Sequence, residues 1–155
     1  MFLYSDEYKH TIAEAWRSYI KASEQGKEMD PELRSAVRPE VFGAWERSRQ
    51  AGVSPYVFKA KKIVGEDLTK VLEENATLIS ASRQYIENLY LFLSGINFVV
   101  ILTDSNGIVL YIKNEDSITK ERTDVLQLSI GSLRGAEYAG SNAMSECLCL
   151  GKPIQ

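Results

Sequence analysis

Apolar residues recur at helical spacing through the first fifty residues and predict a helical N-terminal region. The apolar face of the first expected helix consists of Tyr8, Ile12, Ala15, Trp16, Tyr19 and Ile20. Ser5 suits the start of this helix as an N-cap and Gly26 suits its end. Pro31 and Pro39 each suit the first position of a further helix, because the N–H that proline lacks is unused there. The second of these two helices is expected to end near Ala51.

The longest helical pattern runs from Glu66 to Leu93 and predicts one continuous helix roughly 42 Å long. Its apolar positions repeat every seven residues in a stripe wider than a coiled-coil seam requires. One part of the stripe could therefore cover a sheet while another contacts a partner helix. The residues expected at a dimer interface are Leu68, Leu72, Asn75, Ile79 and Ser82. A helix packed wholly inside its own domain fits the same periodicity.

After Gly95 the pattern becomes typical of strands. Two β-rich runs, 97–103 and 108–112, flank the residues Asp-Ser-Asn-Gly at 104–107. Asn-Gly favours a hairpin because both residues accept positive φ, so we expect two antiparallel strands. The first run is apolar at five successive positions, 98–102, which predicts a central strand buried on both faces.

The rest of the chain gives weaker signals. A helix is expected within 115–128 through Ile118, Val125 and Leu128, followed by a glycine-punctuated loop with a short strand. A short final helix would be capped by Ser141 and ended by Gly151. The lysine-rich stretch at 59–65 is expected to be a solvated connector. The predicted fold class is α+β, with a helical region at 1–64 and a sheet-containing domain at 65–155.

Composition narrows the classes of function. The 155 residues are 45% hydrophobic and 25% charged, as in ordinary globular proteins, and the net charge of -3 disfavours direct nucleic-acid binding by this chain. No window approaches the ~20 apolar residues of a membrane span, so we expect a cytoplasmic protein without membrane contact.

Candidate chemistry is sparse. His10, the only histidine, lies far in sequence from Cys147 and Cys149. Two positions apart on a helix, the cysteines would point in roughly opposite directions, so they could not share a metal ion and are expected to be buried packing residues. "AGSNA" at 139–143 is similar to an anion-binding helix start but lacks the lysine of a P-loop, which favours a capping role. We therefore expect no catalytic residue, no metal site and no cofactor.

Two separated stretches resemble one protein family. "RPEVFGAWERSRQAGVSPY" resembles the "R.E...SW.RS...G..P" element of acetoin- and glycerol-catabolism regulators, which are sigma-54-dependent transcriptional activators. "GSNAMSECLCLGKPIQ" resembles their later "GTNAIGTAL..G.PV" element, although Ser145, Glu146 and Cys147 stand where Gly-Thr-Ala is usual. Between them, the long helix and "FVVILTDSNGIVLYI" resemble the first part of a GAF or PAS-like sensor domain.

The resemblance implies a sensory input domain that binds a small-molecule effector and relays the signal to output domains absent from this chain. Sigma-54 RNA polymerase and DNA would be contacted only through those outputs. A GAF sheet needs five or six strands, so the sheet is expected to be incomplete here. Candidate ligand residues, where the sheet faces the loop before the last helix, are Phe98, Val100, Tyr111, Tyr138 and Asn142.

Two alternatives stay open. The chain could be a ligand-free module that dimerises through the long helix, with Asn75 and Ser82 setting the register. It could also be a small GAF-type thiol reductase that uses Cys147 or Cys149.

Overall fold

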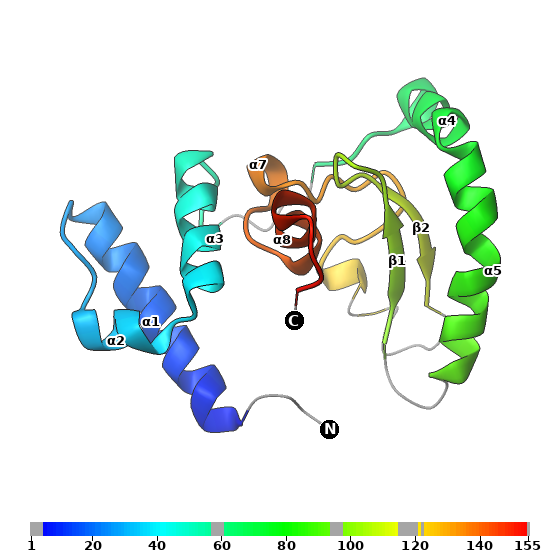
Figure 1. Ribbon diagram of the computed structural model, residues 1–155. Coiled ribbons are helices and arrows are strands. Elements are labelled where there is room, and N and C mark those ends of the chain that lie inside the picture. Colours follow the sequence, from blue (N-terminus) through cyan, green and yellow to red (C-terminus); the bar gives the residue numbers. More distant parts are fainter. Residues whose placement is uncertain (1–4, 57–60, 94–97, 115–120, 122, 155) are drawn as a thin grey trace.

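The computed structural model describes residues 5–56, 61–93, 98–114, 121 and 123–154 (Figure 1). Its named elements, in chain order, are α1 (Asp6–Glu24), α2 (Pro31–Ala36), α3 (Pro39–Gln50), α4 (Gly65–Glu74), α5 (Ala76–Phe92), β1 (Val100–Thr103), β2 (Val109–Lys113), α7 (Ala136–Ala139) and α8 (Ala143–Leu150). The α+β class is confirmed. Within the described part, no helix is both long and apolar enough to cross a membrane.

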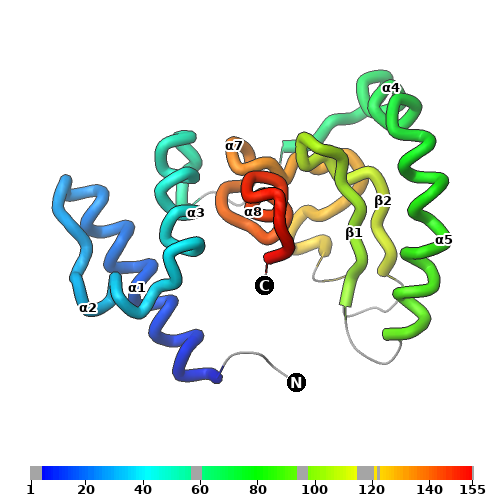
Figure 2. Tube along the Cα trace, viewed as in Figure 1, coloured from blue at the N-terminus to red at the C-terminus, as the bar shows by residue number. Residues whose placement is uncertain are grey.

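The N-terminal helices α1, α2 and α3 pack around an aromatic core, as their periodicity predicts. Trp45 of α3 meets Trp16 and Tyr19 of α1, with ring centroids 5.0 and 5.5 Å apart. The caps also agree with the prediction, since the Ser5 side chain accepts a hydrogen bond from the Tyr8 amide. Helix α3 lies next to α7, and the three N-terminal helices lie on the opposite side of the molecule from α5, which covers the sheet (Figures 1 and 2).

The prediction of one helix from Glu66 to Leu93 is wrong in its continuity. The backbone leaves helical geometry at Asn75, with φ -102° and ψ 11°, and the chain continues as a separate helix. The Asn75 side-chain amide donates to the Val71 carbonyl over 2.9 Å. Such local hydrogen bonds between a side chain and the backbone compete with regular helical geometry. This explains why Asn75 interrupts the helix although the apolar repeat continues on both sides.

β1 and β2 form the predicted antiparallel hairpin, in the register Val100↔Lys113 and Ile101↔Ile112, with an irregularity after Leu102. Helix α5 covers one face (Figure 1). The expected burial of β1 on both faces is wrong, because all four of its residues are only half-buried. The strand also begins later than predicted, at Val100; Asn97 lies outside the described residues.

The hairpin turn uses its residues differently from the prediction. Gly107 has φ of 75°, whereas Asn106 is not among the described residues with positive φ. The Asp104 carboxylate instead accepts hydrogen bonds from the Asn106 and Ile108 amides, at 2.9 and 2.8 Å. A buried aspartate therefore holds the turn, and only the glycine needs the left-handed conformation.

Isolated bridges continue the sheet beyond β2. Ile108 pairs with Leu133, and Ser132 pairs with Lys62. The amide of Leu133 donates to the Lys61 carbonyl over 2.9 Å, so the end of the lysine-rich stretch is bonded through its backbone and is not simply a solvated connector. The short strand expected in this loop is thus present as bridges.

The region before these bridges agrees only in part with the helix expected at 115–128. Residues 123–125 are helical and Leu128 is buried, but Val125 is 75% exposed. Ile118 lies outside the described residues. The short helix α7 was not predicted, because four residues are too few for a periodic signal.

Candidate functional site

The two stretches that resemble regulator motifs lie side by side in space, although about a hundred residues separate them in sequence. Helix α3 belongs to the first stretch and α8 to the second. Gly140, at the start of the second, has φ 64° and ψ -158°, a conformation that is essentially restricted to glycine. A Cβ at Gly140 would lie 3.4 Å from Val53 and 3.5 Å from Ser48 of the first stretch. We call this contact region the α3–α8 junction.

The start of α8 is fixed by its own hydrogen bonds. Asn142, and not the predicted Ser141, is the N-cap, and its side-chain oxygen accepts from the Met144 and Ser145 amides at 3.1 Å each. Its amide nitrogen donates to the carbonyls of Gly140 and Arg134. The Ser145 hydroxyl completes a capping box, which has asparagine in the role usually taken by serine. The predicted capping role of this segment is therefore right, one residue further along.

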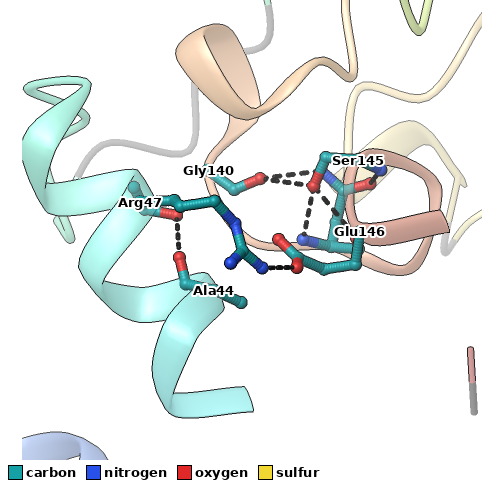
Figure 3. A network of polar contacts seen from close by, with 7 residues as sticks. Ala44, Arg47, Gly140, Ser145 and Glu146 are labelled. Carbon is teal, nitrogen blue, oxygen red and sulfur yellow. Dashed lines mark hydrogen bonds and ion pairs between the residues drawn. The ribbon is translucent and has the colours of Figure 1, made fainter. Parts of the chain in front are cut away.

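An ion pair joins the two helices. The Arg47 guanidinium of α3 donates from Nη2 to Oε2 of Glu146 on α8 (Figure 3). The Glu146 side chain is only 7% exposed and that of Arg47 is 33% exposed. Among the described residues, the buried atoms Glu146 Oε1 and Arg47 Nε have no hydrogen-bond partner. The Glu146 carboxylate is thus held inside the junction with one oxygen paired to Arg47 and the other buried without a hydrogen-bond partner among the described residues.

A cavity of about 300 Å³ opens at this junction. Its lining residues are Arg38, Glu40, Val41, Ala44, Ser141, Asn142, Ala143, Glu146, Lys152, Pro153 and Ile154. Apolar side chains form part of the cavity wall. Two cationic side chains and two carboxylates contribute to the rest of it. The cavity therefore combines an apolar surface with charged groups supplied by both motif stretches, as small-molecule sites commonly do.

The five predicted ligand residues do not gather at one place. Asn142 lines the junction cavity. Tyr111 donates its hydroxyl to Glu87 of α5 over 2.6 Å, and the Phe98 ring packs 5.1 Å from Tyr90. Tyr138, on α7, lies 5.2 Å from the Lys61 ammonium. Val100 is half-buried at the start of β1.

The contact between α5 and β2 includes an ion pair and a side-chain hydrogen bond. The Lys113 ammonium lies 2.8 Å from the Glu87 carboxylate. Hydrogen bonds from Lys113 and then Tyr111 hold the pKa of Glu87 below its ordinary value, and the same carboxylate raises the pKa of the Tyr111 hydroxyl. The polar groups of these side chains are hydrogen-bonded to one another. This face is therefore a contact between helix and sheet and not an open binding site.

The five residues predicted at a dimer interface are all half-buried. Leu68 lies against Gly131, whose added Cβ would be 3.2 Å from the leucine side chain. Leu72, Ile79 and Ser82 are half-buried, as is Asn75 at the break. The exposed large apolar residues of α5 are Leu78, Tyr85, Leu89, Leu91 and Phe92, and all of them except Leu91 follow one different stripe along the helix.

The expected burial of Cys147 and Cys149 is wrong, since both thiols are exposed. Helix α8 instead buries Ser145 and Glu146. The cause is the ion pair and the capping box, which turn the polar positions inward. His10 is exposed beside Glu14, and no group of metal-ligating side chains occurs among the described residues.

Sequence reasoning missed Arg47 and Glu146. Both were visible as members of the two motif stretches, and Glu146 stood out because the resembled motif has threonine there. The sequence alone does not show that the two motif stretches are in contact in the folded chain.

Comparisons with known proteins show that the chain is similar to parts of transcriptional regulators. No family model matches it. A signal-transduction and transcriptional-control protein of Clostridium beijerinckii is 30% identical over 84 residues, which cover 54% of this chain and 12% of that protein. The acetoin dehydrogenase operon transcriptional activator AcoR of Bacillus subtilis (strain 168) is 22% identical over 143 residues, 91% of this chain and 22% of that protein.

A solved structure shares the fold. A chain in the crystal structure of the E. coli DhaR(N)-DhaL complex superposes with a TM-score of 0.67, at 14% identity over 74% of this chain and 38% of that chain. The chain thus spans about a fifth or less of the relatives' sequences. The relatives are regulators and not enzymes, which agrees with the expectation that this chain has no catalytic activity. The resemblance to regulators of the acetoin-activator type is confirmed.

Proposed function

We propose that the chain is the sensory input region of a cytoplasmic transcriptional activator, in which a bound small-molecule effector changes the activity of output domains elsewhere in the protein. Similarity to AcoR over 91% of the chain supports a regulatory role, and the fold shared with DhaR(N) supports an input region. By analogy with the resembled family, the output would act on sigma-54 RNA polymerase.

The observation that carries the proposal is the α3–α8 junction. An input region must connect a binding event to a movement, and a ligand can shift an equilibrium only by binding two states differently. The junction cavity has walls from the N-terminal helices and from α8. A ligand there would therefore bind differently when these two parts move relative to one another. The predicted domain boundary between residues 64 and 65 and the five predicted ligand residues also remain proposals.

A promoter-reporter experiment tests this function. The segment of AcoR that aligns with this chain would be replaced by residues 1–155 in Bacillus subtilis, with a reporter on the acetoin dehydrogenase operon. Small molecules that raise the melting temperature of the purified chain would then be supplied to the cells. Reporter output should change with at least one such compound and should not change in cells carrying native AcoR. If no stabilising compound alters the output, the sensory function is refuted.

A second function, self-association without a ligand, is favoured by the exposed stripe on α5. Tyr85 and Phe92 are 77% and 85% exposed, although soluble proteins rarely leave large apolar groups aligned on one helix face. If α5 pairs with a second copy, Tyr85→Glu should give a monomer by light scattering. The previously predicted interface would instead be sensitive to Leu72→Asp. A chain that is monomeric before any substitution excludes both interfaces.

A further inference from the structure

We propose that a cleft between α1 and the end of α3 binds a methylated ammonium group, with Trp16 and Tyr56 as aromatic walls and Glu24 as the counter-charge. The cleft has a volume of about 430 Å³, which lies within the range of small-molecule sites. It shares no lining residue with the junction cavity. The inference therefore goes beyond the proposed sensory function and does not depend on it.

Aromatic rings line much of this cleft. Trp45 is 7% exposed and Tyr19 is 3% exposed, so these two rings form its floor. Trp16 stacks on Tyr19 with ring centroids 5.8 Å apart and is only half-buried, so part of its surface is accessible. The aliphatic part of the wall comes from Ile20, Val53 and Pro55. A group that enters the cleft is therefore surrounded mainly by aromatic and aliphatic surface.

Tyr56 also lines the cleft, although this residue is 67% exposed. Its hydroxyl donates to Oε1 of Glu24 over 2.8 Å, which joins the loop after α3 to the last residue of α1. The ring is thus held by its polar end and is not buried against other side chains. Because the face of an aromatic ring carries the negative part of its quadrupole, a ring fixed in this position favours a cation beside it.

The charges of the lining also select a cation. Glu24 and Arg49 are the charged residues that line the cleft. The Arg49 guanidinium lies 2.8 Å from the Glu46 carboxylate and also donates to the Tyr19 hydroxyl over 3.2 Å, so its charge is already neutralised. Among the described residues, Glu24 accepts only from the Tyr56 hydroxyl. That hydrogen bond raises the pKa of the hydroxyl, which stays protonated and neutral. One carboxylate thus lies beside aromatic surface without a cation of its own.

The lining suits a methylated ammonium better than a primary one. A primary ammonium carries three N–H donors, and each needs an acceptor once it leaves water. Glu24 is the one carboxylate of the cleft, and most of the wall offers no acceptor. Methyl groups need no acceptor and gain free energy from contact with an apolar wall.

Tryptophan fluorescence at constant ionic strength tests the assignment, because both tryptophans of the chain line the cleft. Choline carries a trimethylammonium group, 3,3-dimethyl-1-butanol is its neutral carbon isostere, and ethanolamine lacks the methyl groups. We expect a saturable change with choline and at least about fivefold weaker binding of the other two, since one lacks the charge and the other the apolar contact. The inference is overturned if choline gives no saturable change, or if either of the other probes binds as tightly as choline.

Substitutions then assign the binding to the named side chains. Tyr56→Leu should weaken choline binding at least about fivefold relative to Tyr56→Phe, which keeps the ring and removes only the hydroxyl. Glu24→Gln should weaken choline binding, whereas the matched control Glu7→Gln, at the exposed start of α1, should not. Both Glu24 and Tyr56 are exposed, so the variants should keep the fold, which their unfolding midpoints in urea check. If Tyr56→Leu binds choline as Tyr56→Phe does, or Glu24→Gln as Glu7→Gln does, the site is wrong.

Discussion

Removing the Arg47 guanidinium should destabilise the N-terminal helices through a contact made on the other side of the junction. The Glu146 side chain is 7% exposed. In Arg47→Met we expect this carboxylate to stay buried but to lose its cation. Breaking a buried ion pair by removing one partner costs about 3–5 kcal/mol. Because one third of the Arg47 side chain is exposed, solvent screens part of the pair and we expect about 2–3 kcal/mol.

The position of the tryptophans makes the assay selective. The chain has two, Trp16 and Trp45, and both lie in the core of the N-terminal helices. Urea unfolding followed by tryptophan fluorescence therefore reports on that core, while the partner Glu146 belongs to α8. The expected loss corresponds to a fall in melting temperature of about 4–12 °C for a domain of this size.

A double-mutant cycle of Arg47→Met and Glu146→Gln isolates the pair from other effects of each substitution. We expect a coupling free energy of about 1–3 kcal/mol, since the two side chains are in direct contact. Arg17→Met, at an exposed position of α1, is the matched control and should cost within about 0.5 kcal/mol of zero. The reasoning fails if Arg47→Met costs no more than this control, or if the coupling is below about 0.5 kcal/mol.

Four further outcomes are expected. Gly107→Ala should destabilise by at least about 2 kcal/mol in urea unfolding, because its Cβ would meet a backbone nitrogen 2.7 Å away at positive φ, whereas Gly26→Ala, with open space around it, should cost about 1 kcal/mol. Asn142→Ala should cost about 1 kcal/mol through loss of the α8 cap; an unchanged unfolding midpoint would contradict the capping box. The carboxyl of Glu87 should titrate below 4.5 by NMR and closer to it in Lys113→Met; since the folded pKa is lowered, the associated stability is present above pH 4.5 and is lost as the pH falls through the folded value. The two cysteines should both react with a thiol reagent in the native chain, and protection that persists until urea is added would contradict their exposure.

Local features of this fold were predictable because they depend on neighbouring residues. The cap at Ser5 and the hairpin around Gly107 each follow from a few adjacent side chains and their φ preferences. The break at Asn75 was missed because one side-chain bond to a carbonyl decided against a periodicity that continued on both sides.

The site itself was not predictable from local pattern. Arg47 and Glu146 are 99 positions apart, and hydrophobic periodicity carries no information on which polar faces will meet. The exposed cysteines follow from the same contact: pattern alone places Cys147 with the apolar residues of α8, but the helix turns Glu146 toward Arg47 and leaves the thiol outside.

The buried ion pair suits a contact that must be specific without being permanent. Replacing a buried pair with apolar side chains is often neutral or stabilising, so the pair is poorly explained as a means to strengthen the junction. It instead penalises every arrangement in which the carboxylate is buried without its guanidinium, while an opened junction can hydrate both groups. Two arrangements, closed and open, are thereby favoured over the continuum between them. A ligand in the junction cavity, whose walls come from both α3 and α8, would stabilise the closed arrangement alone, which is the differential affinity that the proposed sensory input requires.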